Sequence, residues 1–150
     1  RERWGEMIKL GATTFWEMFP GFWGDWWTRS YCHAWSAAPV YFLSRYNLGV
    51  WWDEPGYKEA RIAPIPLDLT WAKGRVPTPT GEIAASWEKT DDSFTIEVAL
   101  PAGTRAVVEL PVSAAEFPKI EAKGFKAEKR GDTWKLELPA GAKGVITAKR

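Results

Sequence analysis

Residues 82–103, "EIAASWEKTDDSFTIEVALPAG", alternate between apolar and polar side chains with a period of two. In the first half, Ile83, Ala85 and Trp87 share one face of an extended chain. In the second half, one face is formed by Phe94, Ile96, Val98 and Leu100. Such alternation is typical of strands with one buried face. The stretch therefore predicts two short strands that are separated by the turn sequence Thr-Asp-Asp.

The same period continues toward the C-terminus, where "DTWKLELP" places Trp134, Leu136 and Leu138 on one face. Turn sequences recur between these runs, namely "TPTG", "PAG", "KRGD" and "PAGAKG". No pattern of helical length follows residue 60. Short alternating strands at regular spacing are typical of an antiparallel sandwich. We therefore predict a jelly-roll-like β-sandwich over residues 54–150.

The composition changes near residue 53, because 8 of the 11 tryptophans precede it. Before this point the pattern is helical. Residues 30–50, "SYCHAWSAAPVYFLSRYNLGV", are apolar or small nearly all round, as in a helix that is buried among other helices. Gly49 suits the end of this helix, because glycine tolerates the left-handed conformation. The chain is thus predicted to be α+β, with helices in residues 1–53 and the sandwich in residues 54–150.

The bulk composition excludes several classes of partner. With 20 Lys and Arg against 19 Asp and Glu, the net charge of +1 offers no broad electrostatic footprint for nucleic acid or an anionic membrane. No apolar run approaches the ~20 residues of a membrane span. A single cysteine, Cys32, and a single histidine, His33, leave no Cys-rich or polyhistidine metal site. We therefore expect no metal and no organic cofactor, and we expect Cys32 to be a small buried residue.

Glu17 lies in an unusually aromatic stretch, residues 11–27, "GATTFWEMFPGFWGDWW". One interpretation is local, because Thr14 followed by Glu17 fits a capping box at the start of a helix. The other interpretation is functional. Aromatic faces stack on the C–H surfaces of pyranose rings, and a carboxylate can act on the glycosidic bond. The aromatic residues that would surround Glu17 in such a sugar site are Phe15, Trp16, Phe19, Phe22 and Trp23.

Three segments in this order resemble the C-terminal end of the bacterial inverting α-L-rhamnosidases: "GATTFWE", "SYCHAWSAAPVYFLSRY" and "EARIAPIPLDLTWAKGRVPTPTGEIAASWE". The resemblance covers residues 11 to about 88, and beyond them only the strand pattern continues it. It implies a glycosidase with a catalytic (α/α)6 barrel, or six-hairpin barrel, followed by a β-sandwich. Residues 1–53 would then be the last barrel helices. The implied activity is release of terminal α-L-rhamnose from a glycoside or polysaccharide by inverting, two-carboxylate hydrolysis.

The resemblance also implies roles for single residues. Glu17 corresponds to the general base, and His33 corresponds to a residue that lines the rhamnose pocket. Without the resemblance, a lone histidine on an apolar helix is more often a hydrogen-bonded core residue. Trp16 would stack on the sugar or pack inward. Trp23 is predicted to bind the substrate, and it too has an alternative role. The tryptophans of its glycine-interrupted loop would form either the rim of the pocket or a plug at the end of the barrel: Trp23, Trp26 and Trp27.

The general acid of this family belongs to an upstream motif that has no counterpart in these 150 residues. The barrel needs about twelve helices, whereas residues 1–52 have room for two or three. We therefore expect a C-terminal fragment that is inactive alone, because loss of one member of an acid–base pair costs about 10²–10⁴ of the rate. Its exposed helices would pair with the remainder of the barrel or with a second copy.

An alternative function is that the sandwich is non-catalytic and either binds carbohydrate or caps the barrel. Trp87 and Trp134 share faces with core residues, so they are predicted to point inward and to be lost as a sugar platform. Only Trp71 remains for that purpose. A cap would instead bury the barrel helices through apolar residues such as Ile62, Ile65 and Leu67, and this is the role that we favour for residues 54–150.

Overall fold

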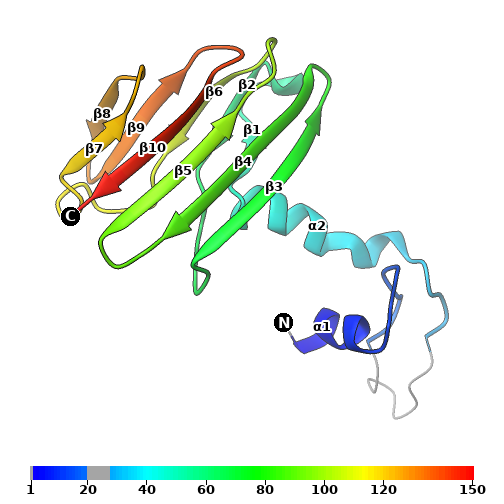
Figure 1. The fold of residues 1–150 in the computed structure, drawn as a ribbon. Helices are drawn as coiled ribbons and strands as arrows, with labels where there is room; N and C mark the ends of the chain where they lie inside the picture. Colours follow the sequence, from blue (N-terminus) through cyan, green and yellow to red (C-terminus); the bar gives the residue numbers. More distant parts are fainter. Residues whose placement is uncertain (1, 20–27) are drawn as a thin grey trace. The chain divides into compact units, whose positions relative to one another are not determined.

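The computed structural model describes residues 2–19 and 28–150. The chain divides into two compact units, one that ends at Tyr41 and one that comprises Phe42–Arg150 (Figure 1). The boundary that the change in composition predicts, between residues 53 and 54, lies further along the chain and stays a prediction. Among the described residues, no helix has both the length and the apolar character that a bilayer crossing requires.

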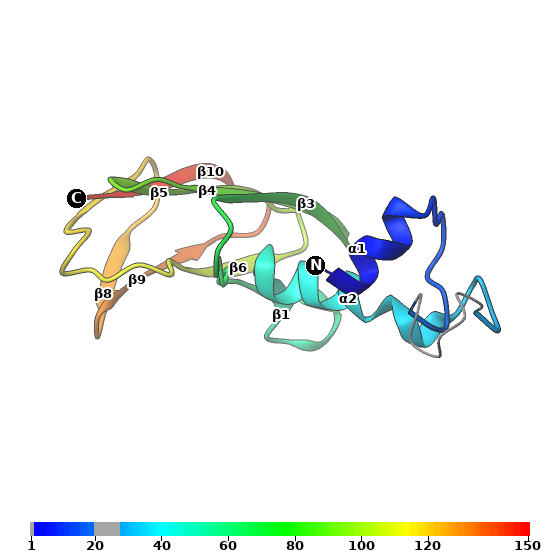
Figure 2. The same cartoon turned by 90° about the horizontal axis from the view of Figure 1, so that it is seen from below.

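The second unit is a sandwich of two five-stranded sheets, shown face-on in Figure 1 and edge-on in Figure 2. The first sheet has the order β1-β2-β6-β9-β8 and comprises β1 (Val50–Trp52), β2 (Glu59–Ile62), β6 (Arg105–Glu109), β9 (Thr133–Leu138) and β8 (Ala127–Arg130). The second has the order β3-β4-β5-β10-β7 and comprises β3 (Trp71–Thr78), β4 (Gly81–Lys89), β5 (Ser93–Ala99), β10 (Lys143–Lys149) and β7 (Lys119–Ala122). The predicted β-sandwich is confirmed. Neighbouring strands are antiparallel except for β2 and β6, which are parallel.

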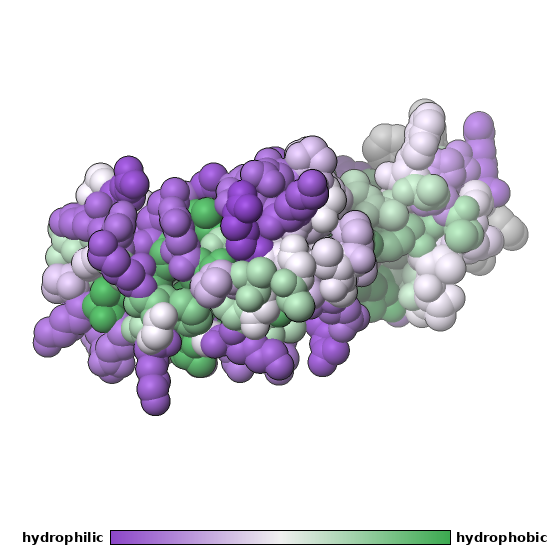
Figure 3. All heavy atoms as spheres, turned by 90° about the horizontal axis from the view of Figure 1, so that it is seen from above, coloured by the Kyte–Doolittle hydropathy of each residue, from purple (hydrophilic) through white to green (hydrophobic). Residues whose placement is uncertain are grey.

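The alternation in residues 82–103 produces the predicted buried face. Ile83, Ala85 and Trp87 of β4 are buried, and so are the alternate residues of β5. Each of the five predicted turn sequences lies between two consecutive strands. On the outside, hydrophilic side chains cover much of the side shown in Figure 3, with smaller hydrophobic areas between them. The periodic signal and the turn residues thus agree, as expected of a sequence that specifies one sheet arrangement.

Two tryptophans anchor the core between the sheets. The ring of Trp87 stacks on Phe94 with 5.5 Å between centroids, and its Nε1 donates a hydrogen bond of 2.7 Å to the carbonyl of Asn47. Trp134 packs against the core, and its Nε1 donates to the carbonyl of Phe117 at 2.9 Å. Both indoles point inward, as predicted, and both satisfy their single donor. Neither is therefore available as an exposed platform.

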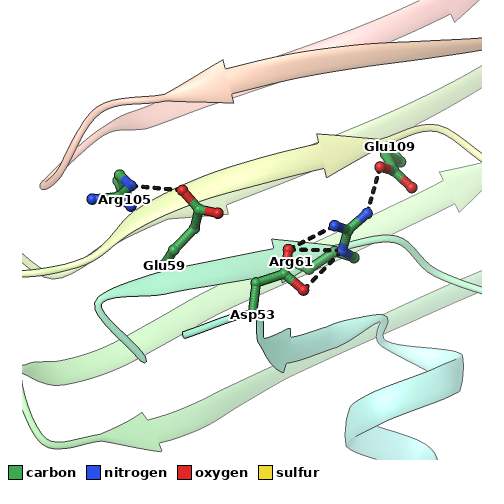
Figure 4. A network of polar contacts seen from close by, with 5 residues as sticks. All are labelled: Asp53, Glu59, Arg61, Arg105 and Glu109. Atoms are coloured by element: carbon green, nitrogen blue, oxygen red, sulfur yellow. Dashed lines mark hydrogen bonds and ion pairs between the residues drawn. The ribbon is translucent and has the colours of Figure 1, made fainter. Parts of the chain in front are cut away.

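Charged side chains join β2 to β6 on the outer face of the first sheet (Figure 4). The Arg61 Nε donates to both carboxylate oxygens of Asp53, at 3.0 and 2.9 Å, and its Nη1 donates to Glu109 at 2.5 Å. Arg105 donates through Nε to Glu59 at 2.6 Å. The hydrogen bond that Arg61 donates to Asp53 raises the pKa of Arg61, and the one that Arg105 donates to Glu59 raises the pKa of Arg105. The network therefore links two strands that are far apart in the sequence, because β3, β4 and β5 lie between β2 and β6 along the chain.

The predicted helix before Gly49 is present as three consecutive helical turns of different pitch: the 3₁₀ helix η1 (Ala34–Ala37), the α-helix α2 (Ala38–Phe42) and the π-helical η2 (Leu43–Asn47). Gly49 follows with a φ of 82°, which is the left-handed conformation expected of it. The expectation that this helix is buried all round is wrong for this chain, because it contains no buried residue and Trp35 is 90% exposed. Burial of a helix requires neighbouring helices, and α1 (Glu2–Lys9) is the only other α-helix among the described residues.

Two further expectations about burial are also corrected. Cys32 is exposed rather than buried, because it lies in an irregular segment outside any core. Ile62 is fully buried within the sandwich itself, so it is not free to cover barrel helices. Ile65 and Leu67 remain exposed, since they lie in the loop after β2.

Candidate functional site

Glu17 lies in an irregular segment of the first unit. The capping box predicted for Thr14 and Glu17 does not form, because residues 12–19 contain no helix and the Thr14 hydroxyl donates instead to the carbonyl of Tyr31. The side chain of Glu17 is half-buried. Its carboxylate has no hydrogen bond or ion pair with any side chain or backbone group in the described part of the chain. The local explanation for this glutamate is therefore wrong.

Backbone hydrogen bonds place Glu17 and His33 on neighbouring segments. The Glu17 N–H donates to the carbonyl of Ser30 at 2.9 Å, and the His33 N–H donates to the carbonyl of Phe15 at 2.8 Å. The Thr28 hydroxyl strengthens this pairing, because it accepts from the Met18 N–H at 3.2 Å and donates to the carbonyl of Ser30 at 2.9 Å. Residues 15–18 and 28–33 thus form one paired structure. Two of the predicted site residues are brought together across it.

The aromatic residues around this pairing meet edge to face. The Trp16 ring lies 5.3 Å from Tyr31 at 90°, and the His33 ring lies 6.1 Å from Trp35 at 75°. Trp16 is half-buried, so it combines packing with a partly open face. Trp23, Trp26 and Trp27 lie outside the described residues.

Trp4 supports the same region, and the sequence reasoning missed it. Its Nε1 donates to the carbonyl of Ser36 at 3.0 Å, and its ring lies 4.9 Å from Phe19 at 87°. The Arg3 guanidinium lies over the ring of Phe19, 5.4 Å from its centroid. The only sequence feature that could have indicated this role of Trp4 is an indole at the start of an amphipathic helix.

The described residues contain no group of three or more His, Cys, Asp or Glu side chains arranged for a metal ion.

The chain is similar to known proteins over both units. A curated alpha-L-rhamnosidase of Formosa agariphila is 33% identical over 135 residues, covering 81% of this chain and 14% of the relative. One from Alteromonas sp. (strain LOR) is 32% identical over 111 residues, covering 65% of this chain and 11% of the relative. The chain therefore spans about a seventh or less of the length of these relatives.

Solved structures agree on the fold. A GH78 family rhamnosidase of Bacillus sp. GL1 is 44% identical, with a TM-score of 0.65 over 74% of this chain and 12% of that one. The alpha-L-rhamnosidase of Dictyoglumus thermophilum is 26% identical, with a TM-score of 0.72 over 97% of this chain and 17% of that one. The Streptomyces avermitilis enzyme, solved with L-rhamnose, has a TM-score of 0.79 at 20% identity over 97% of this chain and 15% of that one, which shows the fold alone.

The family model described as the bacterial alpha-L-rhamnosidase C-terminal domain matches residues 49–125. These residues run from Gly49 through most of the sandwich. Since the match takes in more than half of the 150 residues, this chain belongs to the bacterial alpha-L-rhamnosidase C-terminal domain family.

Proposed function

We propose that this chain is the C-terminal part of a glycoside hydrolase that releases terminal α-L-rhamnose with inversion, and that Glu17 is its general base. The observation that carries the proposal is the pairing of residues 15–18 with residues 28–33, which holds the Glu17 and His33 backbones on adjacent segments. The similarity to alpha-L-rhamnosidases over 81% of the chain supports the substrate class.

The proposed reaction assigns one step to this chain. The Glu17 carboxylate accepts a proton from a water that attacks the anomeric carbon, on the face opposite to the leaving oxygen. A carboxylic acid on the remainder of the barrel protonates that oxygen as the glycosidic bond breaks. The two carboxyl groups must lie about 6.5–9.5 Å apart to leave room for the water. A half-buried Glu17 without a competing partner among the described residues suits this task.

His33, Trp16 and Trp23 would contact the sugar. The His33 backbone N–H is already bonded to Phe15, so its imidazole is the group that would meet a sugar hydroxyl. The half-buried Trp16 would offer its open face to the C–H surface of the ring. Trp23 retains its proposed role at the rim of the pocket. The walls of a closed pocket would come from the rest of the barrel, so the 150 residues alone are expected to be inactive.

The partner of the helical segment is proposed to be the remainder of the catalytic barrel. Phe42 and Leu43 are each more than half exposed, and so is Leu67 in the loop after β2. That loop is tied to η2, because the Ile65 N–H donates to the carbonyl of Tyr46 at 2.8 Å. Exposed apolar side chains that gather in one region mark an interface. This arrangement favours the capping role for the sandwich, through Ile65 and Leu67 rather than Ile62.

The test uses the complete protein of which the proposal makes this chain a part. Glu17→Gln should lower kcat on an aryl α-L-rhamnoside by about 10²–10⁴. The matched control is Glu6→Gln, a partly exposed carboxylate of the same unit that pairs with Lys9 among the described residues. Sodium azide should restore turnover to Glu17→Gln, because azide attacks without needing a base, and the product should be the β-L-rhamnosyl azide. NMR of the first sugar released by the unaltered protein should show β-L-rhamnose.

Three results would count against the proposal. Equal activity of Glu17→Gln and Glu6→Gln would remove Glu17 from the reaction. Turnover by the purified 150 residues, abolished by Glu17→Gln, would show that the remainder of the barrel is unnecessary. Release of α-L-rhamnose as the first product would leave the substrate in place and refute inversion.

A further inference from the structure

The outer face of the second sheet carries a groove that the rhamnosidase site does not use. We name it the β3–β10 groove, after the strands that form its walls. Its floor is made by the small outward side chains of β4 and β5: Ala84, Ser86, Thr95 and Ala99. Among the residues of β4 and β5 that line the groove, only Glu88 and Glu97 carry long outward side chains.

The walls follow from the register of the sheet. Lys73 of β3 lies opposite Ser86, Ser86 lies opposite Glu97, and Glu97 lies opposite Val145 of β10. Trp71 begins the β3 wall, one outward position before Lys73. Two adjoining cavities of about 380 and 320 Å³ occupy the groove, and both are lined by Lys73, Ser86 and Glu97. Their sizes fall within the range of small-ligand sites, about 300–1,000 Å³.

The groove displays polar groups with spare hydrogen-bonding capacity. Trp71 is 66% exposed, and its indole N–H has no protein acceptor among the described residues, unlike those of Trp87 and Trp134. In the same described set, the side chains of Lys73 and Glu88 make no hydrogen bond or ion pair. Within the part of the chain that the structure describes, the Glu97 side chain receives only a long contact of 3.5 Å from the Ser86 hydroxyl. An indole face, an ammonium and two carboxylates therefore open onto one trough.

We infer that the β3–β10 groove binds a neutral oligosaccharide. The indole face of Trp71 stacks on the C–H face of a pyranose ring. Sugar hydroxyls both donate and accept, so they can donate to the carboxylates of Glu88 and Glu97 and accept from the ammonium of Lys73. An anionic chain is disfavoured, because two carboxylates face it and the nearby Arg75 is neutralised by Glu82 at 3.0 Å. The inference does not depend on Glu17 or on hydrolysis.

Binding is measured on the 150-residue chain by affinity electrophoresis in gels that contain one polysaccharide each. The neutral probes are a rhamnan, xyloglucan, arabinoxylan and galactomannan, and polygalacturonate is the anionic probe. At least one neutral probe should retard the chain. Trp71→Ala and Glu97→Ala should each weaken that retardation at least tenfold. The matched control is Trp52→Ala, which removes a tryptophan of similar exposure (52%) from β1 of the opposite sheet.

Each outcome decides the matter, provided that circular dichroism and the melting temperature show that the variants are folded. Retardation by a neutral probe that both groove variants lose and Trp52→Ala keeps supports the groove. No retardation by any neutral probe, retardation by polygalacturonate alone, or equal loss in Trp52→Ala overturns it. Because hydrolysis is not measured, a negative result here leaves the role of Glu17 standing, and an inactive Glu17 leaves the groove standing.

Discussion

Gly49 joins the helical segment to β1 at a point where another part of the backbone passes very close. An ideal Cβ at this position would lie 2.2 Å from the Pro64 nitrogen and 2.6 Å from the Ala63 carbonyl carbon. The neighbouring chain cannot easily move away, because the Ala63 N–H donates to the Gly49 carbonyl at 2.8 Å. Gly49→Ala should therefore destabilise the sandwich through two separate causes.

The first cause is conformational, since a φ of 82° costs an L-residue about 1–2 kcal/mol. The second is steric, because inserting a methyl group into a closely packed site costs about 1–3 kcal/mol. Gly124→Ala is the matched control. Gly124 has a φ of 84°, but a Cβ there would meet nothing within 4 Å, so only the conformational cost applies. The difference between the two variants isolates the close approach of Pro64.

We expect Gly49→Ala to lower the free energy of unfolding by about 2 kcal/mol more than Gly124→Ala does, within a range of about 1–3 kcal/mol. At about 2–4 °C per kcal/mol for a chain of this length, the melting temperatures should differ by about 4–8 °C. Urea unfolding followed by circular dichroism of the sheets should show a lower midpoint with an unchanged slope. If the two variants unfold within about 0.5 kcal/mol of each other, the reasoning about Pro64 is refuted, because that gap lies below the smallest steric cost.

Three further predictions concern the sandwich. Trp87→Ala should lower the free energy of unfolding by about 3–5 kcal/mol in urea titrations, because it empties the largest core position and leaves the Asn47 carbonyl without its donor. Arg61→Ala should lower the free energy of unfolding measurably in urea titrations at low salt, and a double-mutant cycle with Asp53→Ala should show a favourable coupling of about 0.5–3 kcal/mol that high salt reduces. Zero coupling would show that this ion pair does not stabilise the sandwich. Burial raises the pKa of Tyr57 above 10.0, so the contribution of its neutral phenol to the free energy of unfolding is complete below pH 10 and is lost as the pH rises through the higher pKa of the folded state. Tyr57→Phe should therefore flatten the fall in stability above pH 10, and an identical alkaline slope in both proteins would contradict this.

β4 and β5 of the second sheet and β9 of the first could be predicted from the sequence, because each is long enough to show a period. β4 and β5 alternate over nine and seven residues, and turn sequences bound them on both sides. β1 and β2 have only three and four residues, which is too short for a pattern to stand out. In β6, Ala106, Val107 and Val108 are buried in succession, so no alternation marks it. The parallel pairing of β2 with β6 depends on a long connection, which no local signal reports.

The candidate site could be predicted only as a set of residues. The resemblance predicts roles for Glu17 and His33, which stay predictions, and the pairing that brings their segments together is made by backbone groups, which carry no sequence signal. The capping-box motif was misleading, because the Thr14 hydroxyl found an acceptor in Tyr31 rather than in a helix. The exposure of the helix before Gly49 could not be predicted either, since burial depends on what surrounds the segment rather than on its own composition.

The parallel pairing of β2 with β6 also joins strands that are far apart in the sequence. The contact between Glu59 and Arg105 has a high sequence separation, because β3, β4 and β5 lie between the two residues and are synthesised before Arg105. Contacts of high sequence separation are slow to form. During synthesis, the free edge of β2 stays open until β6 has left the ribosome, and an open edge invites pairing with other chains. Glu59 and Arg61 place charges on this strand, and charged side chains are one of the means by which strand edges resist such pairing.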